Sequence, residues 1–148
     1  MVVGGCGHVG LPLALAFADA GLEVGIFDVD AAKLARVAAG EMPFLESGAD
    51  ALLARLIGTG RLHFSAESSI LRRSGVVVLV VGTPIDEFMN PSMTLFDTVV
   101  DGLAPEMVDG ALVILRSTVY PGTTEYVADR LRRAGLSADV VFCPERIA

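Results

Sequence analysis

The sequence predicts an α/β domain built on a doubly wound parallel sheet of roughly six strands, with helices on both faces. Short apolar runs alternate with helix-like segments along the whole chain, as repeated strand–helix units do. Hydrophobic residues make up 53% of the 148 residues, which suits strands that are covered on both sides. A glycine-rich turn joins the first apolar run to the first helical segment. The length is that of one domain, residues 1–148.

The elements follow in a regular order. The expected strands are Met1–Gly4, Glu23–Asp28, Arg61–Phe64, Gly75–Val81, Ala111–Arg116 and Ala138–Cys143. The expected helices are Val9–Ala20, Ala31–Ala39, Ala49–Ile57, Glu67–Arg73, Leu95–Met107 and Thr123–Ala134. Right-handed crossovers between parallel strands favour the strand order 3-2-1-4-5-6.

The first turn, from Gly5 to Gly10, reads Gly-Cys-Gly-His-Val-Gly between a strand and a helix. That context is required for a dinucleotide-binding fingerprint. Gly5 is expected to allow the tight turn, Gly7 to let the backbone approach a pyrophosphate, and Gly10 to let the helix pack closely. The amide groups and the dipole of the helix N-terminus would then hold the phosphates.

Asp28 ends the second apolar run and would accept hydrogen bonds from the adenosine ribose. A 2′-phosphate at that place would meet a carboxylate, and Asp30 adds a second acid. No arginine occurs before Arg36, so the sequence favours NAD over NADP. Lys33 could contact a ribose or a phosphate, or be a solvated helix lysine.

The composition excludes several classes. A net charge of −7 with scattered arginines argues against a nucleic-acid surface. Apolar runs such as Val76–Val81 are far shorter than the roughly 18 residues of a membrane span. No Lys or Arg precedes Lys33, so the basic start of a secretory signal is missing and a cytoplasmic location is expected. The two cysteines, Cys6 and Cys143, are expected to be free thiols, and no metal-ligand cluster appears.

Three further turns fall at the carboxyl ends of strands, where ligands of such sheets bind. Gly82-Thr83-Pro84 follows the fourth strand, Ser117-Thr118 the fifth, and Pro144-Glu145-Arg146 the sixth. Each could be ordinary turn chemistry, and Thr123 could cap the helix after the fifth strand. Because all three lie at the edge that carries the glycine loop, a shared ligand site is favoured.

Together these motifs resemble the UDP-glucose/GDP-mannose dehydrogenase family essentially from end to end. The matching stretches are Gly7-His8-Val9-Gly10-Leu11-Pro12-Leu13-Ala14, Phe27-Asp28-Val29-Asp30, Pro43-Phe44-Leu45-Glu46, Val81-Gly82-Thr83-Pro84, Ser117-Thr118-Val119 with Pro121-Gly122-Thr123-Thr124, and Pro144-Glu145-Arg146. The resemblance implies a Rossmann-type domain of an enzyme that oxidises the C6 hydroxyl of a nucleotide sugar twice, using two NAD and a thioester on a cysteine.

The resemblance also implies roles for matching residues. Its NAD contacts are Gly5, Cys6, Gly7, His8, Val9, Gly10, Asp28, Lys33, Gly82, Thr83, Pro84 and Ser117. Thr118 would order a water near the reacting carbon, and Glu145 would help to activate water. Glu145, Arg146 and Ile147 would face the sugar nucleotide. Pro-Glu-Arg, with Tyr120-Pro121-Gly122, is more similar to the branch that uses UDP-N-acetylhexosamines such as UDP-N-acetylmannosamine.

The catalytic cysteine and lysine of the family lie beyond Pro-Glu-Arg, and Cys143 does not replace them because it is expected on a buried strand. The chain alone is therefore expected to bind NAD without completing the reaction. The resemblance implies a homodimeric full-length enzyme, with this chain alone a monomer or weak dimer.

Two other hypotheses remain open at this point. A hydroxyacid-type dehydrogenase would share the first strand–helix–strand unit but would not need Ser117-Thr118 or Pro144-Glu145-Arg146. A non-catalytic NAD-sensing module would need only the cofactor site.

Overall fold

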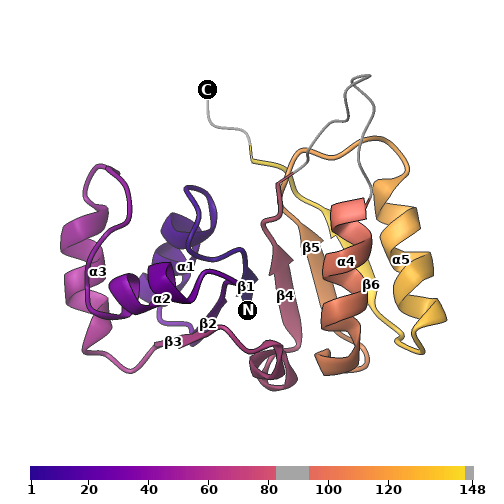
Figure 1. Ribbon diagram of the computed structural model, residues 1–148, viewed down its shortest axis with the longest axis horizontal. Coiled ribbons are helices and arrows are strands. Elements are labelled where there is room, and N and C mark those ends of the chain that lie inside the picture. The colour runs from indigo at the N-terminus through magenta and orange to yellow at the C-terminus, as the bar shows by residue number, and fades with distance from the viewer. Residues whose placement is uncertain (83–93, 146–148) are drawn as a thin grey trace. The chain divides into compact units, whose positions relative to one another are not determined.

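The computed structural model describes residues 1–82 and 94–145, and it divides into two compact units, Met1–Ile70 and Leu71–Ala148. Each unit contains three parallel strands with their connecting helices (Figure 1). Among the described residues, no helix combines the length and the apolar character that crossing a membrane requires.

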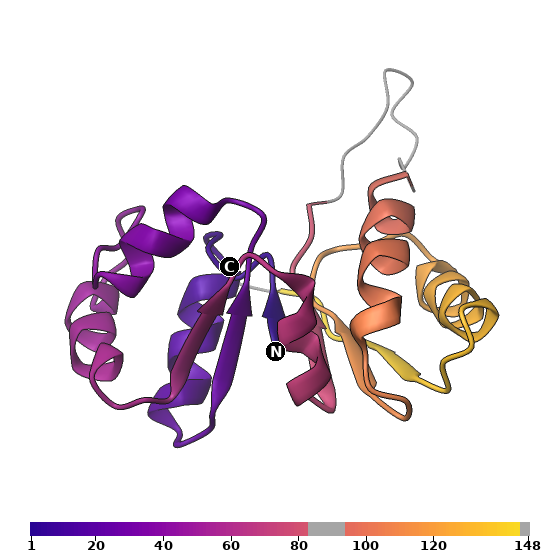
Figure 2. The ribbon, with the colours of Figure 1, turned by 60° about the horizontal axis from the view of Figure 1, so that its bottom comes forward.

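The first unit has the strand order β3-β2-β1. Its elements are β1 (Val2–Val3), α1 (Gly10–Asp19), β2 (Val24–Phe27), α2 (Ala31–Ala38), α3 (Ala49–Ile57) and β3 (Leu62–Ser65). The three strands run side by side in this unit (Figure 2). They are parallel, and the register places Val2 opposite Ile26 and Val24 opposite Leu62. Their carboxyl ends therefore share one edge, where the glycine loop and Asp28 follow β1 and β2.

Helix α1 buries one apolar face in the core of this unit. Its buried residues Leu11, Ala14, Leu15 and Ala18 recur at helical spacing and form one apolar face. That face packs against β1, β2 and α3. Small alanines between the leucines let the helix lie close to its neighbours.

The second unit has the strand order β4-β5-β6. Its elements are the 3₁₀ helix η1 (Ser68–Arg73), which crosses the boundary of the units, β4 (Val76–Leu79), α4 (Thr94–Leu103), the 3₁₀ helix η2 (Ala104–Glu106), β5 (Leu112–Leu115), α5 (Thr123–Arg133) and β6 (Asp139–Phe142). Helices α4 and α5 pack side by side (Figure 1). Val77, Leu79, Val113 and Leu115 form the buried core of the strands.

Two expected helices differ from the structure. The segment Glu67–Arg73 forms only the short 3₁₀ helix η1, because six residues are too few for a stable α-helix. The helix expected over Leu95–Met107 breaks into α4 and η2, with Pro105 in the first turn of η2. A proline starts a helix more readily than it continues one.

The last strand is exposed, contrary to the expectation of a buried strand. In this unit β6 pairs with β5 and forms the edge of the sheet, and Val141 and Phe142 are 41% and 45% exposed. Cys143, directly after β6, is exposed too, so its expected burial is wrong. An edge strand lacks a neighbour on one side. The expected strand order already placed this strand at the edge, so its apolar sequence was not sufficient reason to expect burial.

The expected helix cap at Thr123 is also wrong. Thr123 is the first residue of α5 and is buried, whereas Gly122 occupies the N-cap position with φ of 87°. No side chain caps this helix.

Candidate functional site

The glycine loop leaves β1 through a turn at Gly4 and Gly5. Both amides donate to the Phe27 carbonyl, at 3.0 and 3.1 Å, which ties the loop to the end of β2. The left-handed conformation falls on Gly4, with φ of 73°, and not on Gly5. Glycine is required at position 5 because the backbone there lies close to Ile26. A Cβ at this position would lie 2.7 Å from Ile26 Cγ2. The turn role expected for Gly5 therefore belongs to Gly4.

Gly10 and Gly7 have different surroundings. A Cβ at Gly10 would lie 2.5 Å from the Gly4 carbonyl oxygen and 2.9 Å from Gly5 Cα, so helix α1 can start here only with glycine. A Cβ at Gly7 would come no closer than 3.4 Å to a chain atom, again the Gly4 oxygen. The fold itself leaves room at Gly7, which is the space a pyrophosphate needs against the backbone.

The start of α1 carries free amides. Val9 occupies the N-cap position without a side-chain cap, and the first turn has no acidic residue. The amides of His8, Val9 and Gly10 make no hydrogen bond within the described part of the chain, whereas that of Leu11 donates to the Gly7 carbonyl at 3.0 Å. Unpaired amides at the positive end of a helix favour a phosphate.

Asp28 reaches the same loop from the end of β2. Its Oδ2 accepts from the Cys6 amide at 2.9 Å, and its Oδ1 accepts from the Asp30 amide at 3.1 Å. A carboxylate has about four acceptor sites, so each oxygen can still accept a hydroxyl. The half-buried Asp28 is thus suited to bind a ribose diol.

Asp30 and Lys33 belong to the start of α2. Asp30 caps the helix by accepting from the Lys33 amide at 3.0 Å, and this hydrogen bond lowers the pKa of its carboxyl. The Lys33 ammonium lies 3.5 Å from Asp30 and is 52% exposed. This exposed ion pair leaves Lys33 able to reach a ligand, and the contact with NAD stays a prediction.

The side chains of Cys6 and His8, also in this loop, differ in burial. Cys6 is buried, and burial, followed by the charges of Asp28 and Asp30, raises the pKa of its thiol to about 12. Its amide is therefore the part of Cys6 that serves the site. His8 is exposed and its ring lies 4.0 Å from that of Phe44, at 31°. Phe44 comes from the segment between α2 and α3, a contact that the sequence alone did not indicate.

The second unit brings other predicted residues together at the ends of its strands. The Ser117 hydroxyl donates to the Val81 carbonyl and so fastens the end of β5 to the segment after β4. Gly82 follows Val81 and is exposed, as is Thr118. Thr83, Pro84, Arg146 and Ile147 lie outside the described residues.

Glu145 is held by Arg116, a residue that the sequence analysis missed. Arg116 Nη2 donates to Glu145 Oε2 at 2.6 Å, and Nη1 donates to the carbonyls of Cys143 and Pro144 at 3.1 and 2.9 Å. The Glu145 amide in turn donates to the Arg116 carbonyl at 3.0 Å. The two side chains are only 20% and 26% exposed. The signal available in the sequence was a cation directly after an apolar strand.

The arrangement suits the adenosine diphosphate half of NAD. Free amides and an open Gly7 accept a pyrophosphate, and Asp28 accepts ribose hydroxyls while repelling a 2′-phosphate. No group of three or more His, Cys, Asp or Glu side chains that could hold a metal occurs among residues 1–82 and 94–145.

Comparison with known proteins identifies the family of the chain. Residues 1–148 match the family model of the UDP-glucose/GDP-mannose dehydrogenase family, NAD binding domain. A UDP-N-acetyl-D-mannosamine dehydrogenase from Pyrococcus horikoshii is 31% identical over 97% of this chain and 35% of its own length. A UDP-glucose 6-dehydrogenase from Pseudomonas aeruginosa is 33% identical over 86% of this chain and 28% of its own length.

A solved structure shows the same fold. The UDP-D-ManNAc dehydrogenase from Pyrococcus horikoshii matches all of this chain and 37% of its own, with a TM-score of 0.90 and 30% identity. The doubly wound, Rossmann-type parallel sheet is thereby confirmed, and so is NAD as the cofactor of the matched domain. The chain spans about a third of the length of the curated relatives it matches.

Proposed function

The chain belongs to the UDP-glucose/GDP-mannose dehydrogenase family as its NAD-binding domain, and on that premise we propose that the protein containing it is a nucleotide-sugar 6-dehydrogenase. The observation that supports this most is the match of the whole chain, loop motifs included, to one family. The match also removes the reason for assigning a hydroxyacid-type dehydrogenase.

The proposed reaction converts a C6 hydroxymethyl group to a carboxylate. Two hydrides leave C6, each to one NAD⁺, and water supplies the second carboxylate oxygen. The balanced reaction is R–CH₂OH + 2 NAD⁺ + H₂O → R–COO⁻ + 2 NADH + 3 H⁺. The glycine loop and Asp28 would bind NAD during both oxidations. Gly82, Thr83, Pro84 and Ser117 are proposed as further NAD contacts because they match the motifs of the family.

The water-dependent half of the reaction is assigned to Thr118 and Glu145. Thr118 is exposed directly after Ser117, where its hydroxyl is free to order a water. Glu145 presents one oxygen to Arg116, and the other oxygen is available to take a proton from water. Because Arg116 also holds the backbone before Glu145, the carboxylate has a fixed position from which to act.

The substrate is proposed to be a UDP-N-acetylhexosamine, with Glu145, Arg146 and Ile147 facing it. The sequence Pro144-Glu145-Arg146 supports this choice, as do UDP-N-acetyl-D-mannosamine dehydrogenases among the relatives. The full-length protein is proposed to be a homodimer, and this chain by itself a monomer or weak dimer.

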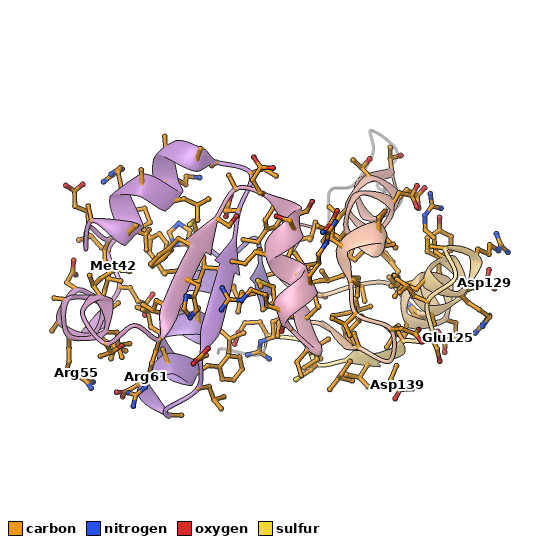
Figure 3. All side chains as sticks on the ribbon, turned by 90° about the horizontal axis from the view of Figure 1, so that it is seen from below. Met42, Arg55, Arg61, Glu125, Asp129 and Asp139 are labelled. Carbon is orange, nitrogen blue, oxygen red and sulfur yellow. The ribbon has the colours of Figure 1, made fainter. Side chains whose placement is uncertain are left out.

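The test is to assay NAD reduction by the full-length protein with UDP-N-acetylmannosamine, UDP-N-acetylglucosamine and UDP-glucose. We expect two NADH per uronate with a UDP-N-acetylhexosamine, and a fall in kcat of about 10²-fold or more for Glu145→Gln. The control is Glu125→Gln, an exposed glutamate on α5 (Figure 3). NADH binding without turnover of any nucleotide sugar would favour the non-catalytic NAD-binding module instead.

A further inference from the structure

Three consecutive amides of the glycine loop are held by two consecutive residues at the end of β2. The Phe27 carbonyl accepts from Gly4 and Gly5, and the Asp28 carboxylate accepts from Cys6. The first two bonds end on a backbone oxygen, which any residue at position 27 supplies. The third ends on a side chain and therefore depends on the identity of residue 28.

We propose that Asp28 is a positioning residue for the pyrophosphate cradle as well as an acceptor for the ribose, so that one carboxylate couples the two halves of the cofactor site. This inference rests on the proposed binding of NAD at this loop. It differs from a simple ribose contact, because it gives Asp28 a task before any ligand is present.

The geometry supports this task. The Cys6 amide directly precedes Gly7, and the free amides of His8, Val9 and Gly10 follow within four residues. Among the described residues, the Gly7 amide donates to the Gly4 carbonyl at 3.3 Å, and the carbonyls of Gly7 and Val9 accept from the first turn of α1 at 3.0 and 3.3 Å. The Asp28 carboxylate is the side chain that holds an amide of this stretch. A hydrogen bond from an amide to a carboxylate is charge-assisted and stronger than one between neutral groups. Its loss would let the Gly5–Cys6 peptide turn and would misdirect the amides that follow.

The carboxylate is itself held from the other side. Asp28 Oδ1 accepts from the Asp30 amide while Oδ2 accepts from Cys6, so both oxygens are fixed before ribose arrives. A ribose diol then meets acceptors that do not have to reorganise. A preformed site of this kind saves the ordering free energy that binding would otherwise require.

The consequence concerns NADPH. If Asp28 were only a ribose contact, Asp28→Ala would remove the repulsion of a 2′-phosphate and NADPH would bind more tightly. If Asp28 also holds the cradle, both cofactors lose affinity, because both depend on the same pyrophosphate contacts.

The experiment measures two properties of the wild type, Asp28→Ala and Asp30→Ala. Amide hydrogen exchange of Cys6 is followed by NMR without ligand, and NADH and NADPH are titrated by nicotinamide fluorescence. Asp30→Ala is the matched control, because it removes a neighbouring carboxylate and the cap of α2 but keeps the Asp28–Cys6 bond. We expect Cys6 exchange to rise about tenfold in Asp28→Ala alone. We also expect both cofactors to bind that variant more weakly.

Unchanged Cys6 exchange in Asp28→Ala, or tighter NADPH binding, would overturn the proposal. If Asp28→Ala does not fold, Asp28→Asn tests the proposal in its place. The single amide oxygen of asparagine can accept from only one of the Cys6 and Asp30 amides, so we expect an exchange rate of Cys6 between those of the wild type and of a full loss of the bond. Failure of the wild type to bind NADH would contradict the NAD site, while faster Cys6 exchange would still establish the structural half of the proposal.

Discussion

Gly7 and Gly10 lie three residues apart in one loop, and the structure requires glycine at only one of them. The carbonyl of Gly4 blocks a side chain at Gly10, whereas Gly7 has ordinary contact distances. We expect Gly10→Ala to lower the free energy of unfolding by about 2–4 kcal/mol, because backbone atoms must shift. Gly7→Ala should change it by less than about 0.5 kcal/mol. Urea denaturation measures both values, and equal losses would contradict this distinction.

The two cysteines should differ in reactivity. Burial raises the pKa of Cys6 to about 12, so at pH 8 its thiol stays protonated and enclosed, whereas Cys143 is exposed. We expect a thiol reagent at pH 8 to label one cysteine per folded chain, identified as Cys143 by mass spectrometry. Cys143→Ser should abolish the labelling. Labelling of Cys6 before unfolding would contradict the buried loop.

The sequence did not reveal which residues each side chain of the site contacts. Asp28 was predicted as a ribose acceptor, but its bond to Cys6 joins residues 22 positions apart. Arg116 and Glu145 are 29 positions apart. Local patterns report the type of element and the chemistry of a residue, whereas such partners depend on which strand ends meet and on which rotamers fit.

At the scale of elements, α4 and α5 are joined by a charged network. Arg130 on α5 pairs with Asp97 and Asp101 on α4, and Tyr126 donates to Asp97. The pKa of Asp101 is lowered, chiefly by the hydrogen bond from Arg130. A carboxyl with a lowered folded pKa stabilises the fold above its unfolded pKa, about 3.9, and loses that effect as pH falls through its folded pKa.

We therefore expect Arg130→Met to lower Tm by about 2–4 °C at pH 7 and by progressively less below about pH 4. Arg132→Met is the control. The Arg132 side chain is 72% exposed, and within residues 1–82 and 94–145 it pairs only with Asp129 on the same helix, which is labelled in Figure 3. Thermal unfolding from pH 3 to pH 7 measures the differences. A difference that grows as pH falls would contradict the assigned role of Asp101.

Removing the Arg116 side chain should lower the free energy of unfolding more than removing an exposed arginine. The loss of Arg116 leaves Glu145 and two carbonyls without their donor in a largely buried place. We expect Arg116→Met to cost about 1–2 kcal/mol, against less than about 0.5 kcal/mol for Arg133→Met, whose partner Asp129 is solvated. A double-mutant cycle with Glu145→Gln isolates the pair, and a coupling near zero would show that the two side chains act independently.

The elements themselves were largely predictable. Every strand but β3 and the helices α1, α2, α3 and α5 lie within their expected ranges, because apolar runs and helical periodicity are local properties. Strand β3 ends at Ser65, one residue beyond its expected range. Two elements differ from the prediction, one in its burial and one in its helix type. The exposure of β6 depends on its place at a sheet edge, and η1 is too short for helical periodicity to distinguish a 3₁₀ helix from an α-helix.

For the whole molecule, the strand–helix alternation predicts the doubly wound class, and the order within each unit follows the expected 3-2-1 and 4-5-6 halves. The glycine loop with Asp28 predicts NAD, which the family match confirms. The catalytic and substrate roles of Thr118, Glu145, Arg146 and Ile147 stay predictions, because a local motif gives the chemistry of a side chain but not its contacts with a substrate.

The most direct measurement is a titration of this chain with NADH and NADPH, following nicotinamide fluorescence in the wild type and in Gly7→Ala. The chain has no tryptophan, so the emission reports the cofactor. We predict that the wild type binds NADH in preference to NADPH. Gly7→Ala should fold with the stability of the wild type but bind NADH at least about tenfold more weakly, because its methyl group occupies the space of the pyrophosphate. Equal binding of NADH and NADPH, or unchanged affinity in Gly7→Ala, would contradict the NAD site proposed at this loop.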